Sequence, residues 1–318
     1  MATAAGGVAA ALSPLSGRDY LSSADCSAEE TSALLDLAAQ LKSGDRRIDL
    51  GNRVLGLIFT KASTRTRVSF QVAMARLGGQ TVDLNPQVTQ LGRGEPLEDT
   101  ARVLSRYCDV LAVRTFAQQE LVDYAHWATV PVINALTDLE HPCQSLADFL
   151  TMREAHGDLP GQTLVYIGDG NNVAHSLMLS GALLGVNVRI GCPQGFEPLP
   201  GVLEQARSLA VQGASIEVIH DPREAVRGAQ AVYTDVWASM GQEDEQSERE
   251  QAFAGFCVDE ALMEAADTEA IVLHCLPAHR GEEISPGVME SSASRIFDQA
   301  ENRLHAQQAL LAALMGGL

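Results

Sequence analysis

Lysine is nearly absent from this chain of 318 residues: only Lys42 and Lys61 occur, and arginine supplies every other basic side chain. Lysine and arginine together number 22 against 41 acidic residues, which leaves a formal net charge of −19 at pH 7. A chain this acidic lacks the positive field with which nucleic-acid-binding proteins attract phosphate backbones. We therefore expect no nucleic-acid partner, and any anion site must be a local cluster of positive groups.

Three further absences narrow the class of protein. No apolar run approaches the ~20 residues that a membrane-spanning helix needs, so we expect no membrane association. The six cysteines form no CxxC pair, which predicts reduced thiols in a cytoplasmic protein. The first seventeen residues are rich in alanine and glycine and contain no basic side chain. This excludes the charged start of a signal peptide and an arginine-rich mitochondrial presequence, so we expect a frayed tail there.

What the chain does contain is an alternation of short apolar runs and helical patterns, which is typical of parallel sheets covered by helices on both faces. The expected strands are 54–60, 81–84, 110–114, 130–134, 163–167, 186–190, 215–219, 231–234 and 271–274. The expected helices include 27–42, 64–77, 97–106, 144–155, 172–184, 201–211 and 302–315. Because Pro142 interrupts the chain between the two series, we predict two α/β domains, 1–143 and 144–298, each with a central parallel sheet flanked by helices.

Unusual polar loops begin where these apolar strands end. They are 61–67, 114–116, 141–144, 168–172, 235–242 and 274–280. In open α/β sheets, ligands bind outside the carboxyl ends of the strands. Two sheets that face each other would bring all six loops together, so we expect an enzyme with its active site in the cleft between the domains.

The segment 63–67 reads Ser-Thr-Arg-Thr-Arg and joins a strand to a helix. The N–H groups of a first helical turn can bind an anion, and Ser63 is a suitable N-cap. Arg65 can grip a phosphate through two parallel hydrogen bonds. The apolar residues that follow predict a buried helix, and a buried helix with a cationic first turn needs an anion. This pattern favours a phosphate site over a capped helix whose arginines pair with surface carboxylates.

The segment 141–144 reads His-Pro-Cys-Gln and opens another helix. An imidazole and an amide together can polarise a carbonyl group and hydrogen-bond an NH₂ group. A structural histidine is the alternative. Cys143 beside His141 also suggests zinc, but no second pair of ligands has suitable spacing, so we expect no metal.

The segment 168–172, Gly-Asp-Gly-Asn-Asn, is similar to the start of a dinucleotide-binding fingerprint. The third glycine is replaced by Val173, and no acidic residue ends the next strand, which disfavours a nicotinamide cofactor. Asn171 and Asn172 suit a carboxylate or an amide better.

Two more strand ends carry reactive side chains. Asp235 precedes Ser239 and Met240 by a few residues, and its carboxylate either holds an ammonium group or caps a turn. Cys275 ends the last strand, just before a proline. As a covalent nucleophile it would need an adjacent base, and the alternative is an inert buried thiol.

Taken together, these motifs resemble those of the ornithine carbamoyltransferases, a branch of the aspartate/ornithine carbamoyltransferase family. The segments 63–67 and 141–144 are typical of carbamoyltransferases in general. Asp-Val-Trp-Ala-Ser-Met-Gly at 235–241 and His-Cys-Leu-Pro-Ala-His-Arg at 274–280 are typical of the ornithine branch. The resemblance extends over nearly the whole chain, from Gly17 to Arg303.

The resemblance implies direct transfer of a carbamoyl group from carbamoyl phosphate to the δ-amine of ornithine, with no cofactor and no metal. It implies that the C-terminal helix, within 299–318, crosses back to the first domain. It also implies a homotrimer and a role in arginine metabolism, in the synthetic or the reverse direction.

The resemblance assigns roles to matching residues. The phosphate would be held by Ser63, Thr64, Arg65, Thr66 and Arg114, and Gln90 would reach the site of a neighbouring subunit. The carbamoyl group would be bound by His141, Gln144, the Leu276 main chain and Arg303. The amino-acid group of ornithine would be held by Asn172, Asp235, Ser239 and Met240, with Cys275 near its side-chain amine. The oxyanion of the tetrahedral intermediate would be stabilised by Arg114, His141 and the Thr66 hydroxyl.

Three alternatives stay open. The acceptor amine can belong to aspartate, putrescine or an acetylated ornithine, and an acceptor screen decides between them. A catalytically inactive ligand sensor would bind carbamoyl phosphate without turnover. A nicotinamide-dependent dehydrogenase would reveal itself in a cofactor titration.

Overall fold

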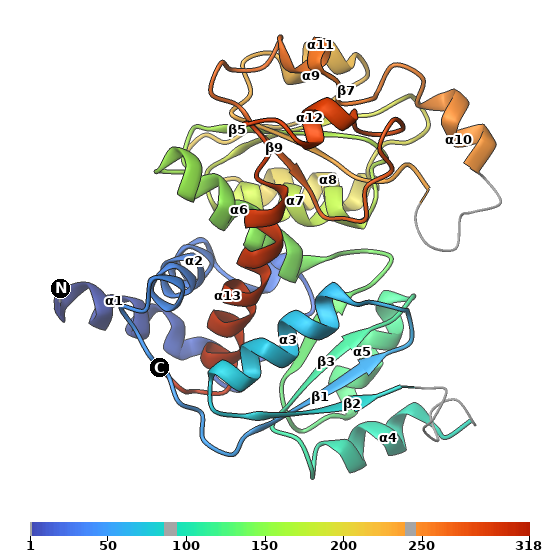
Figure 1. The fold of residues 1–318 in the computed structure, drawn as a ribbon. Coiled ribbons are helices and arrows are strands. Elements are labelled where there is room, and N and C mark those ends of the chain that lie inside the picture. Colours follow the sequence, from blue (N-terminus) through green and yellow to red (C-terminus); the bar gives the residue numbers. More distant parts are fainter. Residues whose placement is uncertain (1, 86–93, 239–245) are drawn as a thin grey trace. The chain divides into compact units, whose positions relative to one another are not determined.

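The computed structural model describes residues 2–85, 94–238 and 246–318 (Figure 1). The chain divides into two units, one formed by Met1–Leu150 with Asn302–Leu318 and the other by Thr151–Glu301. The sequence places the boundary between residues 143 and 144, whereas the units divide inside helix α6 (Pro142–His156). No helix in the described part of the chain is both long and apolar enough to cross a membrane.

The first unit contains a parallel sheet of four strands in the order β2-β1-β3-β4. Its strands are β1 (Val54–Phe59), β2 (Gln80–Leu84), β3 (Val110–Arg114) and β4 (Val132–Leu136). Its helices are α1 (Ala2–Leu12), α2 (Ala28–Ser43), α3 (Arg65–Arg76), α4 (Leu97–Leu104), α5 (Gln118–Trp127), the start of α6 and most of α13 (Ile296–Leu314).

The second unit contains a parallel sheet of five strands in the order β7-β6-β5-β8-β9. Its strands are β5 (Thr163–Ile167), β6 (Asn187–Gly191), β7 (Ile216–Ile219), β8 (Ala231–Thr234) and β9 (Ile271–His274). Its helices are α7 (Asn172–Leu183), α8 (Pro200–Leu209), α9 (Pro222–Val226), α10 (Gln246–Ala252), α11 (Glu260–Met263) and α12 (Pro286–Met289). In Figure 1, α7 and α8 lie on one side of this sheet and α9, α11 and α12 on the other.

Burial explains why the strands read as continuous apolar runs. Every residue of the inner strands β3, β5 and β8 and of the edge strand β9 is buried, because helices cover both faces of each sheet. The edge strand β2 is instead exposed or half-buried along its length. The prediction of two α/β domains with parallel sheets is therefore confirmed.

The N-terminal segment differs from the expected frayed tail, since Ala2–Leu12 forms helix α1. Alanine has the highest intrinsic helix propensity, and tertiary packing supplies the rest. Leu12 and Leu15 are fully buried, and α1 packs against α2. The N–H group of Gly17 donates to the carbonyl of Leu314 at 2.8 Å, which ties this segment to the C-terminal helix.

The prediction that α3 is buried over most of its circumference is wrong. Phe70 and Met74 are fully buried, but 49% of Val68 and 37% of Val72 are exposed. Val82 on the adjacent edge strand β2 is 45% exposed. The helix is apolar on two sides, and only one side packs on the sheet of its own unit.

Candidate functional site

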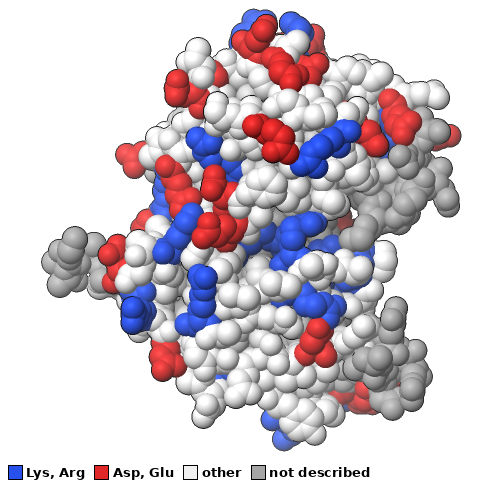
Figure 2. Space-filling model, in the orientation of Figure 1, with Lys and Arg blue, Asp and Glu red and all other residues white. Residues whose placement is uncertain are grey.

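The first unit gathers positive and polar groups at the carboxyl ends of its strands. Arg65 and Thr66 begin α3 after β1, Arg114 ends β3, and His141 precedes α6 after β4. Arg303 reaches the same place from α13. On the face shown in Figure 2, basic side chains gather over the beginning of α3. We call Ser63, Thr64, Arg65, Thr66, Arg114, His141, Gln144 and Arg303 the cationic cluster.

The first turn of α3 is joined to the preceding loop by a hydrogen bond from the main chain of Thr66 to the side chain of Ser63. Thr64 occupies the N-cap position without a capping hydrogen bond, and the Ser63 hydroxyl accepts the N–H of Thr66 at 3.3 Å. The predicted N-cap, Ser63, thus lies one position before the N-cap of the structure, Thr64. The hydroxyl of Thr66 accepts a hydrogen bond from the Arg303 guanidinium, and both residues are buried. Because that hydroxyl accepts here, its own proton is available for a ligand.

His141 is the electrostatic centre of the cationic cluster. Its side chain is buried, and burial holds its pKa well below the usual 6.5. The charges of Arg303, Arg114 and Arg65 lower the pKa further. His141 is thus a neutral imidazole at neutral pH, surrounded by guanidinium groups. The cluster is buried around His141 and Arg303 and exposed at Arg65, so an anion can reach its positive charges.

Neighbours of His141 support this arrangement. The amide Nε2 of Gln144 donates to Asp148 at 2.8 Å, while its buried Oε1 has no hydrogen-bond partner among the described residues. That oxygen is suited to accept from an NH₂ group of a ligand. Burial raises the pKa of Cys143 to about 12, and its Sγ lies 3.4 Å from the carbonyl of Asn134. Cys143 is a buried thiol and a poor metal ligand.

Lys61 carries a fourth positive group next to the cluster. Burial lowers its pKa, and the charge of Arg114 lowers it further. Its Nζ lies 3.8 Å from the centre of the Phe116 ring, a favourable cation–π geometry.

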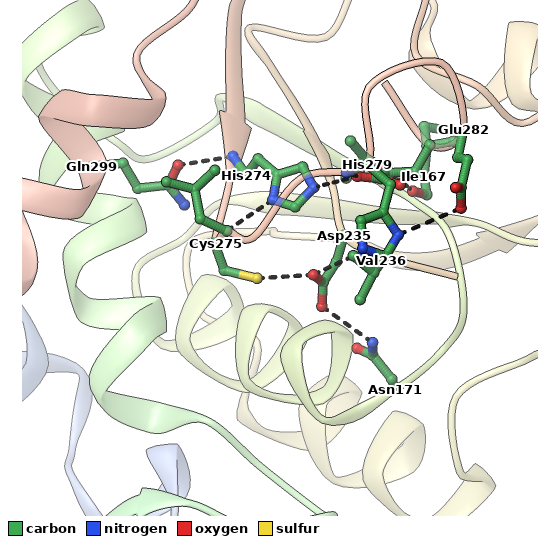
Figure 3. Close-up of polar contacts among 12 residues, drawn as sticks. Ile167, Asn171, Asp235, Val236, His274, Cys275, His279, Glu282 and Gln299 are labelled. Atoms are coloured by element: carbon green, nitrogen blue, oxygen red, sulfur yellow. Dashed lines mark hydrogen bonds and ion pairs between the residues drawn. The ribbon is translucent and has the colours of Figure 1, made fainter. Parts of the chain in front are cut away.

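The second unit gathers a different set of groups at the carboxyl ends of β5, β8 and β9 (Figure 3). The Cys275 thiol donates to Oδ1 of Asp235 at 3.0 Å. On the other side of this carboxylate, Nδ2 of Asn171 lies 3.5 Å from Oδ2. Asp235 is buried, so these contacts and the N–H of Val236 at 2.9 Å stabilise its charge. We call Asn171, Asn172, Asp235 and Cys275 the anionic cluster.

Asn171 belongs to the anionic cluster, although the family resemblance assigns a binding role only to its neighbour Asn172. Its Oδ1 caps α7 by accepting the N–H groups of Val173 and Ala174 at 2.9 and 3.2 Å. The cap turns its Nδ2 toward Asp235 and leaves Asn172 as the first residue of the helix. The two consecutive asparagines are the sequence signal for this arrangement. The first, Asn171, is used as the N-cap, and the side chain of the second, Asn172, is not needed for capping.

A network behind Cys275 fixes the loop that follows β9. Nδ1 of His274 accepts the N–H of Leu276 at 2.8 Å, so Nε2 carries the proton and donates to Glu283 at 3.0 Å. The main-chain N–H of His274 donates to Gln299 at 2.8 Å. Leu276 has a φ of +61°, a conformation that a non-glycine residue adopts at a cost, and these bonds hold it. Sequence patterns gave no signal for Glu283.

Arg249 of α10 fixes the loop that follows β8. Its guanidinium donates to Asp169 at 2.7 Å and to the carbonyl of Trp237 at 2.9 Å. Both partners lie in loops beside Asp235, at the ends of β5 and β8. The candidate residues Gln90, Ser239 and Met240 lie outside the described residues.

Two groups among the described residues have the donor atoms for a metal ion: Asp235 with His274 and Cys275, and His279 with Glu282 and Glu283. In the first group both ring nitrogens of His274 are already engaged, by Leu276 and by Glu283. In the second, the His279 ring lies 3.4 Å from Glu282, and the side chains of these two residues are 50% and 39% exposed.

Comparisons with known proteins match both units to one family. Residues 18–154 match the model of the carbamoyl-P binding domain of aspartate/ornithine carbamoyltransferases, and residues 160–314 match that of the Asp/Orn binding domain. The chain is 98% identical over 318 residues to an ornithine carbamoyltransferase of Parasynechococcus marenigrum, covering 100% of both chains. It is 81% identical over 312 residues to that of Prochlorococcus marinus strain MIT 9313, covering 98% of each.

Solved structures give the same result. The ornithine carbamoyltransferase of Pyrococcus furiosus is 50% identical, with a TM-score of 0.91 over 96% of this chain and 99% of that one. That of Gloeobacter violaceus is 56% identical, with a TM-score of 0.86 over 94% of this chain and 98% of that one.

Proposed function

Because the chain belongs to the aspartate/ornithine carbamoyltransferase family, we propose that it transfers the carbamoyl group of carbamoyl phosphate to the δ-amine of L-ornithine, giving L-citrulline and phosphate. The observation that carries this proposal is the contrast in charge between the cationic and the anionic cluster. One is complementary to a phosphorylated donor, and the other to an amine.

The cationic cluster takes carbamoyl phosphate. Arg65, Arg114 and the first turn of α3 bind its phosphate through charge-assisted hydrogen bonds, with Ser63, Thr64 and Thr66 as further donors. His141, Gln144 and Arg303 bind the carbamoyl group, together with the main chain of Leu276. The buried, unpartnered Oε1 of Gln144 supports this assignment, since the carbamoyl NH₂ is the donor it lacks.

The chemistry needs no covalent enzyme intermediate. The neutral δ-amine attacks the carbamoyl carbon and a tetrahedral oxyanion forms. The C–O bond to phosphate then breaks, and the new nitrogen cation gives its extra proton to the departing phosphate. Arg114, His141 and the Thr66 hydroxyl donate hydrogen bonds to the oxyanion. Because His141 is neutral, it stabilises this charge as a hydrogen-bond donor and not as a cation.

The anionic cluster takes ornithine. Asn172 and Asp235 hold the amino-acid group, with Ser239 and Met240, and Cys275 lies near the side-chain amine. An ornithine amine has a reference pKa of ~10.4, so it must lose a proton before attack. The buried carboxylate of Asp235 supports a role in orienting that amine.

The proposal extends to assembly and cellular role. We infer a homotrimer that works in the cytoplasm in arginine biosynthesis. The half-exposed Val68, Val72 and Val82 support a contact between subunits on this side of the first unit. A native mass of about three times 33.9 kDa is the expected measurement, and a monomer mass would contradict the trimer.

Citrulline formation from ornithine and carbamoyl phosphate tests the activity. In an acceptor screen we expect turnover with ornithine and at most trace turnover with aspartate, putrescine or N-acetylornithine. Comparable rates with putrescine would overturn the acceptor assignment. Binding of carbamoyl phosphate without turnover of any acceptor would support a ligand sensor instead.

A further inference from the structure

A cavity in the first unit uses none of the residues of the cationic cluster. Its volume is about 560 Å³, within the range of small-molecule sites. It is formed by the end of α2, the loop that follows, the end of α3 and the side chain of Gln308 on α13, elements that Figure 1 shows near one another. All of these residues lie in one unit.

Three arginines line this cavity: Arg46, Arg47 and Arg76. The described residues offer none of them a side-chain hydrogen bond or an ion pair, unlike Arg67, which pairs with Asp83. Nη1 of Arg46 is also buried without a hydrogen-bond partner. Buried donors of this kind are rare in native proteins unless water or a ligand satisfies them.

The same cavity presents acceptors. Gln308 is 5% exposed, and in the part of the chain that the structure describes its buried Oε1 has no hydrogen-bond partner. The carboxylate of Asp49 lies against Gly78, where an added Cβ would come within 2.2 Å of Oδ1. The N–H of Gly51 donates to this Oδ1 at 2.8 Å and fixes the carboxylate. The cavity thus offers cations and acceptors to the same ligand.

This combination selects the class of ligand. An inorganic anion would satisfy the guanidinium groups, but it carries no positive charge for the carboxylate of Asp49 and would be repelled by it. A zwitterion with separate carboxylate and ammonium groups satisfies both sets. Leu41, Ile48 and Leu77 add apolar surface for the rest of such a molecule.

We propose that this cavity binds a free α-amino acid, with its carboxylate on Arg46 and Arg76 and its ammonium on Gln308 and Asp49. The site is separate from the proposed function, and its existence does not depend on that function.

Calorimetric titration of the full-length protein tests the proposal. Saturating ornithine and inorganic phosphate first occupy the proposed catalytic site, and each of the other common amino acids is then titrated. We expect at least one to bind with one equivalent per chain. If ornithine itself is the ligand, its own titration shows two equivalents per chain.

Three variants decide where that ligand binds. Arg46→Ala and Gln308→Met should each weaken the binding by about tenfold or more, because each removes one of the groups that contact the ligand. Gln308→Met keeps the side-chain volume and removes an unpaired buried acceptor, so it should not lower the stability of the fold. Arg106→Ala removes an exposed charge of the same unit outside the cavity and should leave the binding unchanged.

Two results would overturn the proposal. One is the absence of any second equivalent for every amino acid, which would mean that the cavity holds water only. The other is binding that persists at full strength in both Arg46→Ala and Gln308→Met.

Discussion

The two units have the same kind of fold but carry opposite charges at the carboxyl ends of their strands. At the strand ends of the first unit, guanidinium groups surround a histidine that burial and those charges keep neutral. At the strand ends of the second, a buried carboxylate is held between a thiol and an amide. A parallel sheet therefore sets where the polar loops lie and leaves their charge to the loop residues.

The two clusters also differ in how they are supported. The cationic cluster takes its residues from helix starts, one strand end and a distant helix, and long-range contacts such as Arg303 with Thr66 join them. The anionic cluster is supported from within its own loops, by Arg249, His274 and Glu283. Substitutions should consequently affect donor binding most in the first unit and acceptor binding most in the second.

The largest effect is expected from Arg65→Lys, which keeps the charge and removes the planar fork that grips a phosphate with two hydrogen bonds. We expect a loss of ~2–4 kcal/mol of transition-state stabilisation, or roughly 30- to 900-fold in kcat/KM for carbamoyl phosphate. Steady-state kinetics of citrulline formation measure it. Arg67→Lys is the matched control, because Arg67 already pairs with Asp83, and it should retain most activity. A loss under tenfold for Arg65→Lys would remove Arg65 from the phosphate site.

The next largest effect is expected from Asp235→Asn in the other unit. The substitution keeps the size of the side chain and removes the charge that faces Cys275 and Asn171. Hydrogen bonds to charged groups contribute ~1.5–3 kcal/mol, so kcat/KM for ornithine should fall by roughly 10- to 150-fold. The apparent KM for carbamoyl phosphate should change little. An equal rise in both KM values would mean that the two clusters do not divide the substrates as proposed.

A third prediction uses the lowered pKa of His141. In the unfolded chain this histidine has a pKa of ~6.5, whereas the folded protein keeps it neutral well below that. Below about pH 6.5 the unfolded state therefore binds a proton that the folded state does not, and stability falls as the pH falls, by up to ~1.4 kcal/mol per pH unit. Protonation of His141 favours the unfolded state. The stability that its neutral form contributes is therefore fully present only above the pKa of His141 in the unfolded chain.

Urea unfolding of wild type and His141→Gln between pH 5 and 8 measures this contribution. We expect the wild type to lose more stability than the variant on the acid side. His126→Gln, which replaces an exposed histidine of the same unit, should follow the wild type. Parallel curves for wild type and His141→Gln would show that His141 is not held neutral in the fold.

The fold was largely predictable because its strands are short apolar runs bounded by glycine and polar residues. The strands β5, β8 and β9 begin and end where the sequence predicts, at 163–167, 231–234 and 271–274. Helix α1 was missed because a run of alanine and glycine has no amphipathic period, and its burial depends on packing against α2. Local pattern cannot supply contacts of that kind.

The candidate site was predictable where a motif stands at a strand end, and unpredictable where support comes from elsewhere in the chain. Arg65, His141 and Asp235 follow that rule. Glu283 does not, because its contact with His274 depends on a loop whose path no periodicity describes. The exposure of Val68 and Val72 was likewise unpredictable, since an apolar helix face looks the same in sequence whether a sheet or another surface covers it.

The smallest effect is expected at Cys275, and it separates a thiol that donates a hydrogen bond from one that attacks the substrate. Cys275→Ser keeps a donor toward Oδ1 of Asp235, so we expect kcat/KM within a few-fold of wild type. Cys275→Ala removes the donor, which is worth ~0.5–1.5 kcal/mol, or roughly 2- to 13-fold. A nucleophilic thiol would instead lose nearly all activity in both variants, because neither can form the same covalent intermediate. Single-turnover kinetics of the two variants distinguish these cases. An inactive Cys275→Ser enzyme that still binds ornithine would contradict direct transfer and indicate covalent catalysis.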